Sequence, residues 1–211
     1  MEELFLARPW LGLKVRSPAD IQPHPAGSEA EDAQFYVALY HVALAIISSL
    51  DRGHIQLLAV QSVTEATGVK GCAIWALGAE RDRLDLVASY GLSRRYLDKG
   101  VLRPELNAGL RETLEGRIVI RDITNAVEWQ YPEEARKEGI VMALSLPLVV
   151  RGRAAGALCL YLAERRSFSE AELEFLSALA NLSACALENA SQFASVQHGY
   201  ELLVEYACVP H

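Results

Sequence analysis

In the middle of the chain the hydrophobic positions follow the periodicity of β-strands. Within residues 84–90, Leu84, Leu86 and Ala88 fall on one face, whereas 71–77 is apolar almost throughout, as in a strand buried on both sides. Arg151-Gly152-Arg153 joins two further apolar runs, and so short a connection favours antiparallel pairing. The pattern predicts five strands, at 71–77, 84–90, 117–122, 142–150 and 154–162.

Apolar spacings of four and three predict helices on both sides of this strand region. A first helix starts at Ser28, which forms a capping box with Glu31, and a second helix spans 55–66. Between the strands we expect a short helix at 106–114 and a single helical turn near residue 132. The last helix starts at Ser169, where Glu172 completes another capping box, and runs to residue 206.

The last helix has two apolar stripes, although one stripe is enough to pack a helix on a sheet. The first stripe weakens after residue 190, whereas the second keeps a heptad spacing as far as Ala207. We therefore predict a homodimer in which the terminal helices of two copies form a four-helix bundle. The alternative is that the second stripe packs on the N-terminal helix of its own chain. The predicted dimer contacts are Phe35, Leu39, Val42, Ile46, Phe175, Leu179, Leu182, Asn189, Phe193, Val196, Tyr200 and Leu203.

The composition fits one domain with helical extensions and excludes several kinds of partner. The 211 residues are 51% hydrophobic and 22% charged, which is sufficient for a buried core. The net charge is −7 and basic residues are not clustered, so a nucleic-acid partner is not expected. The longest apolar runs are about ten residues, too short to span a bilayer, and the acidic N-terminus does not resemble a signal peptide. We expect a cytoplasmic protein without a membrane partner.

Five segments, taken in order, carry a resemblance to a known family. They are LLAVQSVTEATGVKGCAIWAL, LDLVASYGL, LEGRIVIRDITN, SLPLVVRGRAAGALCLYL and FSEAELEFLSALANLSACALENA. Together they resemble the GAF domain, a sensory and dimerisation module of bacterial signalling proteins, over residues 57–190. The resemblance implies an α+β fold with a central antiparallel sheet of five to six strands. The terminal helices would pack on one face, and loops and short helices would form the lid of a ligand pocket on the other.

The resemblance also places the ligand pocket between the sheet and residues 90–143. Aromatic side chains with a few polar groups suit a small organic ligand. The signatures of the family's tetrapyrrole-, cyclic-nucleotide- and haem- or iron-binding members are missing here, and the four cysteines lack metal-site spacing, so no cofactor or metal is expected. The pocket candidates are Trp75, Tyr90, Tyr96, Arg103, Arg121, Asp122, Trp129, Tyr131, Met142, Cys159 and Tyr161.

These observations lead to one leading hypothesis and two alternatives. The leading one is a non-enzymatic cytoplasmic sensory domain that dimerises and binds an unidentified small molecule. Residues 1–28 would be an N-terminal arm, 29–190 the GAF-like domain and 191–211 an extension of the last helix towards an output domain in a longer parent protein. The first alternative is a structural dimerisation module whose pocket has collapsed. The second is a cysteine-based redox sensor or an enzyme similar to methionine sulfoxide reductases, which requires an exposed, activated thiolate.

Overall fold

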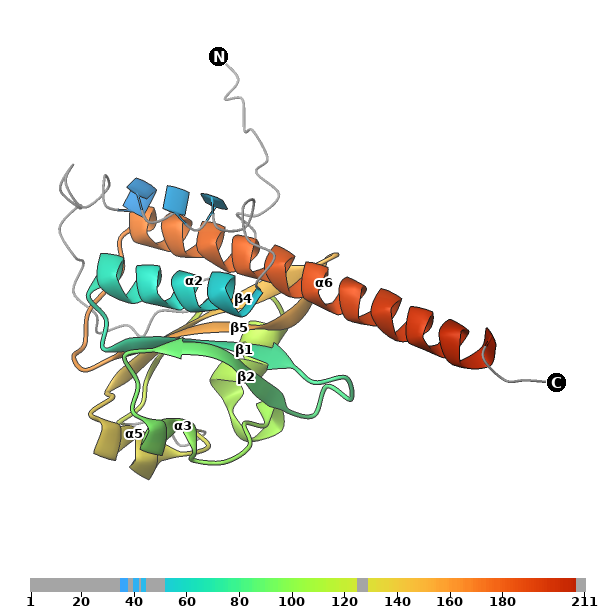
Figure 1. Cartoon of the computed structure of the whole chain (residues 1–211). Coiled ribbons are helices and arrows are strands. Elements are labelled where there is room, and N and C mark those ends of the chain that lie inside the picture. The colour runs from blue at the N-terminus through green and yellow to red at the C-terminus, as the bar shows by residue number, and fades with distance from the viewer. Residues whose placement is uncertain (1–34, 38–39, 42, 45–51, 125–128, 208–211) are drawn as a thin grey trace, which may run out of the picture.

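The polypeptide forms three layers, with a sheet between a pair of long helices and a cover of short ones (Figure 1). The structure, a computed structural model, describes residues 35–37, 40–41, 43–44, 52–124 and 129–207, with side chains as far as residue 188. Helices α2 (Arg52–Thr67) and α6 (Glu170–Ala207) cover one face of the sheet. On the opposite face lie α3 (Arg94–Leu97), η1 (Pro104–Leu106), α4 (Ala108–Leu114) and α5 (Pro132–Glu138). We call residues 93–114 and 129–141, which carry these short helices, the lid.

The sheet is entirely antiparallel, with the strand order β2-β1-β5-β4-β3. The predicted α+β fold with five antiparallel strands is therefore confirmed. The bounds of the strands are Gly71–Leu77, Leu84–Tyr90, Val119–Asp122, Met142–Val150 and Arg153–Leu162 for β1 to β5. The third strand begins two residues later than predicted, because the backbone N–H of Arg117 still donates to the carbonyl of Glu112 in the turn after α4.

Side chains on the two faces of the sheet belong to two separate hydrophobic cores. Along β4, Met142, Leu144, Leu146 and Leu148 point towards the long helices. They belong to the helix-side core, which also takes Leu158, Leu160 and Leu162 of β5, Val60 and Val63 of α2, and Leu176 and Leu179 of α6. Each fully buried Leu or Val contributes about 1.5–3 kcal/mol, so this core is the main source of the fold's stability. The second core lies under the lid and contains the candidate site.

Helix α6 begins as its sequence predicts. The backbone N–H of Glu172 donates to the Ser169 hydroxyl at 3.1 Å, and the Ser169 N–H donates to the Glu172 carboxylate at 2.9 Å. These two bonds satisfy amide groups that the first turn of a helix leaves without partners, so the predicted capping box is confirmed. The box that was predicted at Ser28 and Glu31 lies outside the described residues.

The first part of the second apolar stripe of α6, which we predicted to contact a second copy, packs within its own chain. Phe175 and Leu179 are buried in the helix-side core, and Leu182 packs against it. The ring of Phe35 stacks on that of Phe175, with centroids 4.7 Å apart and an interplanar angle of 15°. At these four residues the contacts lie within one chain, because α2 and Phe35 lie on this side of α6. Leu39, Val42 and Ile46 lie outside the described residues, as do the side chains of Asn189, Phe193, Val196, Tyr200 and Leu203.

Gly156 on β5 marks the closest approach between two strands. A Cβ atom at this position would lie 2.1 Å from the carbonyl oxygen of Trp75 on β1. We predict that Gly156→Ala lowers the free energy of unfolding by at least about 2 kcal/mol, because β1 and β5 would have to separate. Urea unfolding measures this change. Gly109→Ala in α4 is the control, since its Cβ would meet no atom closer than 3.4 Å and alanine favours a helix. Equal stability of the two variants would contradict the prediction.

Candidate functional site

The lid and the sheet enclose a small cavity whose walls are largely aromatic. Its volume is about 10 Å³, room for roughly one water molecule. Strand β5 supplies Cys159 and Tyr161 as the floor, and the lid supplies the rest. The lining residues are Tyr96, Lys99, Leu102, Asn107, Leu110, Trp129, Tyr131, Cys159 and Tyr161.

The floor of the cavity is a buried group of polar side chains. The indole N–H of Trp75 donates to the Tyr161 hydroxyl at 3.2 Å, and the Ser145 hydroxyl lies 3.5 Å from the Cys159 sulfur. The rings of Tyr96 and Tyr161 meet edge to face, with centroids 5.6 Å apart. The Tyr96 hydroxyl is buried without a hydrogen bond of acceptable geometry, although the Tyr161 hydroxyl is near enough to limit the rise in its pKa. Burial raises the pKa of both phenols, so both stay protonated at neutral pH.

Lys99 places its ammonium group against the faces of two rings in this site. The nitrogen lies 4.0 Å from the centroid of the Tyr96 ring and 4.9 Å from that of Trp75. It also donates a hydrogen bond to the backbone carbonyl of Tyr96 at 3.2 Å. Among the described residues, no carboxylate lies within ion-pair distance of it. The ring faces and the carbonyl are thus the principal partners of this cation.

Burial lowers the pKa of Lys99 to about 8, an effect that the Cys159 thiol and the more distant carboxylates of Glu138 and Glu134 oppose. At neutral pH the amine is mostly protonated, and at pH 9 it is mostly neutral. A half-buried ammonium without a counter-ion is uncommon, because no ion pair offsets the cost of removing the charge from water. Here the two aromatic faces offset part of that desolvation cost.

Two parts of the lid are tied together over the cavity by the side chains of Gln130 and Tyr131. The Gln130 amide accepts a hydrogen bond from the backbone N–H of Arg103 and donates to the carbonyl of Val101, both at 2.8 Å. The Tyr131 hydroxyl also donates to the Val101 carbonyl, at 2.9 Å. Gly100, with a φ of +123°, passes so close that a Cβ there would lie 2.7 Å from the Tyr131 hydroxyl oxygen. These contacts hold residues 100–103 against 129–131.

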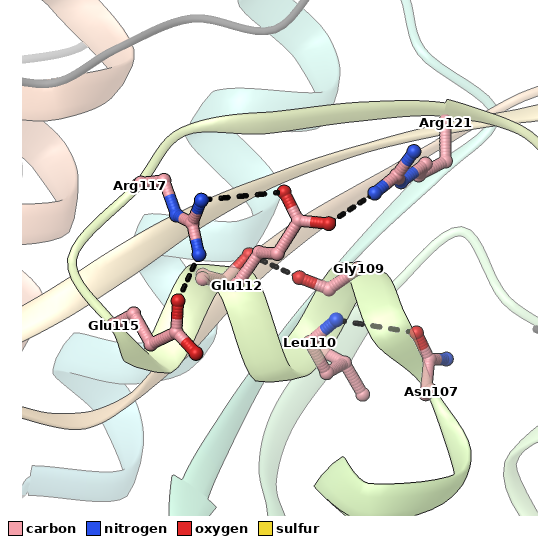
Figure 2. Close-up of polar contacts among 8 residues, drawn as sticks. Asn107, Gly109, Leu110, Glu112, Glu115, Arg117 and Arg121 are labelled. Atoms are coloured by element: carbon pink, nitrogen blue, oxygen red, sulfur yellow. Dashed lines mark hydrogen bonds and ion pairs between the residues drawn. The ribbon is translucent and has the colours of Figure 1, made fainter.

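Helix α4 is fixed to β3 by charged side chains on its outer surface (Figure 2). Glu112 accepts a hydrogen bond from Arg121 of β3 and lies 4.0 Å from Arg117, which also pairs with Glu115. At the start of the helix the side-chain oxygen of Asn107 accepts a hydrogen bond from the backbone N–H of Leu110 at 3.2 Å. Because Asn107 and Leu110 line the cavity, this clamp also positions one of its walls.

The family model of the GAF domain matches residues 51–187, which is most of the chain. The chain belongs to the GAF domain family. GAF domains serve as sensory modules in signalling proteins, and the lid-side cavity described above lies within the matched region. A comparison with curated protein sequences finds no match.

Solved structures that share this fold come from several kinds of protein. The chain is similar to the GAF domain of a phosphoenolpyruvate-protein phosphotransferase from Coxiella burnetii, with 17% identity, a TM-score of 0.68, and coverage of 78% of this chain and 98% of that one. It is also similar to the free methionine-R-sulfoxide reductase of Neisseria meningitidis, with 16% identity, a TM-score of 0.63, and coverage of 81% and 98%. A methyl-accepting chemotaxis protein matches with 19% identity, a TM-score of 0.60, and coverage of 72% and 98%. At these identities the likeness shows the fold alone.

Six of the pocket candidates lie together in the GAF domain. Tyr96, Trp129, Tyr131, Cys159 and Tyr161 line the cavity. Trp75 lies beside it, bonded to Tyr161 and facing the Lys99 ammonium.

Two candidates lie on the other face of the sheet. Met142 is buried in the helix-side core, since its neighbour Ala143 takes the position facing the lid. Tyr90 is exposed on the edge strand β2 and pairs with Cys72, whose side chain also belongs to the helix-side core. Because paired residues on adjacent strands share a face, Tyr90 points away from the cavity.

Three charged candidates support the lid from outside the cavity. Arg103 lies at the surface near Asp82, with 3.4 Å between the guanidinium and the carboxylate, and Arg121 belongs to the α4 clamp. Asp122 pairs with Arg165 and accepts hydrogen bonds from the N–H and hydroxyl of Thr124, at 2.9 and 2.6 Å. None of the three is among the residues that line the cavity.

The sequence interpretation missed Lys99, Leu102, Asn107 and Leu110. Asn107 and Leu110 lie in the short helix that we predicted at 106–114. They could have been identified as pocket residues if we had assigned which face of that helix points inward. Lys99 carried no such signal, because a lone lysine in a polar stretch normally lies at the surface. Its preceding helix, α3, has only four residues and leaves no periodic pattern.

The structure gives little support to thiol chemistry. Burial raises the pKa of Cys72, and it raises that of Cys159 to about 11, in spite of hydrogen bonding from Ser145 and Tyr161. Cys185 is exposed on α6, and Cys208 lies outside the described residues. Within the described ranges no group of three His, Cys, Asp or Glu side chains is arranged to hold a metal ion. None of the helices in that part of the chain combines the length and apolar character needed to span a bilayer.

Asp122 gives a test of how the loop beside the site is held. Although partial burial opposes ionisation, the hydrogen bonds from Arg165 and Thr124 hold the pKa of Asp122 below its usual value. A depressed pKa stabilises the fold above the unfolded pKa of about 3.9, and this contribution is lost as the pH falls through the folded value. We predict that Asp122→Asn lowers the melting temperature by a few degrees at pH 7, and that the difference from wild type shrinks below about pH 4.

Thermal unfolding followed by circular dichroism between pH 2.5 and about pH 7 measures this effect. The control is Asp85→Asn, which removes a more exposed carboxylate paired with Arg83 and should leave the melting temperature unchanged. A difference for Asp122→Asn that stays constant down to the lowest pH would refute the role of its ionised form.

Proposed function

We propose that this GAF domain is a non-enzymatic sensory module that dimerises through its terminal helices and transmits the state of its lid-side site through α6. The observation that carries the proposal is the form of α6, which packs on the sheet and then continues far beyond it (Figure 1). We further propose a cytoplasmic location, an output domain in a longer parent protein, and no nucleic-acid or membrane partner.

The helical residues described near the N-terminus, which are 35–37, 40–41 and 43–44, support a second copy of the chain as partner. On one side Phe35 stacks on Phe175 of α6. Tyr36, Tyr40 and Leu44, spaced four residues apart, lie on another face together with Val37 and are exposed, with 74% of Tyr36 and 61% of Tyr40 accessible. Several large apolar side chains that gather on one helix face in water are typical of an interaction surface. A two-fold dimer would pair this face with its own copy and bury both.

The length of α6 supports the same arrangement. Its 38 residues span about 57 Å at about 1.5 Å per residue. Ala186 packs with Ile55, Leu187 packs against the helix-side core, and the helix continues to Ala207. The sequence of this extension keeps apolar residues at spacings of three and four. Because an isolated helix of this length is only marginally stable in water, the matching helix of a second copy would stabilise it as a coiled coil.

Strand β5 supports a path from the site to the helix. Cys159 and Tyr161 face the cavity, while Leu158 and Leu160, which alternate with them, pack in the helix-side core with α6. A ligand that displaces Cys159 or Tyr161 would therefore also displace the β5 residues on which α6 packs. Transmission requires a ligand that binds one arrangement of the α6 pair better than the other.

A second function is favoured by the small size of the cavity. With about 10 Å³ free, its own aromatic side chains and Lys99 fill the site. A structural dimerisation module that binds no ligand would have this appearance. A sensory module would also have it if a ligand replaced one of the side chains that now fill the space.

Thermal unfolding across a library of metabolites separates the two functions. For a sensory module we predict that one chemical class raises the melting temperature by several degrees, because a ligand that binds only the folded state stabilises it. Sedimentation equilibrium with and without that compound shows whether the α6 pairing changes. A stable dimer that no compound stabilises would support the structural module instead.

The dimer itself is tested by a charge on the exposed face of the N-terminal helix. We predict that Tyr40→Glu weakens self-association by about 30-fold or more, since it places a carboxylate in a buried apolar interface. Sedimentation equilibrium measures the dissociation constant. Leu106→Glu is the matched control, because Leu106 is 53% exposed but lies in the lid, where the charge should leave self-association unchanged. If Tyr40→Glu dimerises as tightly as wild type, this helix face is not the interface.

A further inference from the structure

The cavity under the lid already holds a cation, which the chain itself supplies. The Lys99 ammonium lies over Tyr96 and Trp75 at 4.0 and 4.9 Å from their ring centroids and donates to the Tyr96 carbonyl at 3.2 Å. Two aromatic faces and a carbonyl oxygen are the groups that recognise an organic ammonium ion. The site therefore has the chemistry of a cation receptor, with its position taken by a side chain.

The hold on Lys99 is weak in one respect. In the described part of the chain the ammonium has no carboxylate partner, and burial disfavours its charge. The charge lies at the end of a flexible four-carbon stem on a half-buried residue. The side chain can therefore rotate so that the ammonium leaves the cavity and is solvated by water. Withdrawal would leave the two ring faces and the carbonyl free. The space vacated by the lysine stem would add to a cavity that is now about 10 Å³.

We propose that the lid-side cavity binds a small organic cation, a primary or methylated ammonium group, in the place now taken by the Lys99 ammonium. Lys99 is then a built-in competitor that fills the site when the ligand is absent. This inference rests on the sensory function proposed above and names its ligand class. It also accounts for a cavity that is small in the ligand-free structure.

The surroundings of the ammonium favour a cation over an anion as the ligand. The faces of Tyr96 and Trp75 carry the negative side of the ring quadrupole, and the Tyr96 carbonyl is a hydrogen-bond acceptor. An anion at this point would face three repulsive partners and gain one attraction, that of Lys99. The two possibilities predict opposite effects when Lys99 is removed, since a competitor hinders binding and a counter-ion helps it.

The test compares wild type with Lys99→Ala, using tetramethylammonium and methylammonium chloride as probes and sodium chloride at equal ionic strength as the blank. Binding is followed by tryptophan fluorescence, because Trp75 and Trp129 lie at the site, and by the melting temperature. We expect Lys99→Ala to bind both probes at least tenfold more tightly than wild type. The control Lys137→Ala removes a surface lysine of α5 that pairs with Glu133, and it should bind as wild type does.

A pH series on the wild-type protein gives a second measurement that does not depend on the folding of a variant. The affinity for tetramethylammonium should rise between pH 6.5 and 9.5, as Lys99, with a pKa of about 8, loses its charge and competes less. Of the other groups that act on it, the Cys159 thiol and the phenols of Tyr96 and Tyr161 keep their protons in this range. Burial raises the pKa of Cys159 to about 11 and raises the pKa of both phenols. The carboxylates of Glu134 and Glu138 favour the charged form of Lys99 from beyond ion-pair distance. In Lys99→Ala the pH dependence should disappear.

Two results would overturn the proposal. One is equal or weaker binding of both probes by Lys99→Ala, together with a flat pH series in wild type. The other is stabilisation of wild type by sodium acetate, with acetamide as the neutral control, that is lost in Lys99→Ala, which would make Lys99 the counter-ion of a carboxylate ligand. Neither result refutes the sensory function, which fails only if the metabolite library yields no ligand of any class.

Discussion

The structure depends on β5 being buried on both faces. This strand lies at the centre of the sheet, between β1 and β4, and its two faces supply two different cores. On the helix side it presents Leu158, Leu160 and Leu162, which are large and purely apolar. On the lid side it presents Ala157, Cys159 and Tyr161, which are small or carry a polar atom. A strand with both faces buried has no position that can change without altering one core or the other.

This constraint explains why the polar groups of the site are so few and so well placed. The floor of the cavity must be compatible with a buried strand, so each polar atom there needs a partner within the protein. Trp75 and Tyr161 satisfy one another, and Ser145 lies beside Cys159. The Tyr96 hydroxyl and the Lys99 ammonium are the two groups at the cavity whose surroundings leave them short of partners. A ligand that forms hydrogen bonds or cation–π contacts with such incompletely satisfied groups gains binding free energy, because those groups are short of partners in the close-packed core.

The bounds of the strands and of the last helix could be predicted from the sequence more accurately than the face of the sheet on which each side chain lies. Three strands, β1, β2 and β4, match the predicted bounds, because their apolar runs are bounded by turns with glycine or charged residues. The Ser169–Glu172 capping box is a local interaction and was predictable for the same reason. Tyr90 and Met142 were assigned to the lid side and lie on the other. In β2 the assignment fails at a register shift between Ile74 and Trp75, where the pairing partner advances from Ala88 to Leu86. A bulge of this kind reverses the faces beyond it, and the local pattern of β2 gives no sign of it.

The cage around Lys99 was beyond the reach of local pattern for a different reason. It is built from Trp75 of β1 and from the ring and carbonyl of Tyr96 in α3, so its parts come from a strand and a lid helix that lie 21 residues apart in the sequence. Trp75 and Tyr96, which surround the Lys99 ammonium, both contact Tyr161 of β5, the strand that packs under α6. A close-packed interior resists small displacements until a different packing becomes available, and a change of occupant in the cage is the kind of local event that selects between two packings. In the proposed function, the part of α6 beyond the sheet would carry a small rotation at its base to its far end.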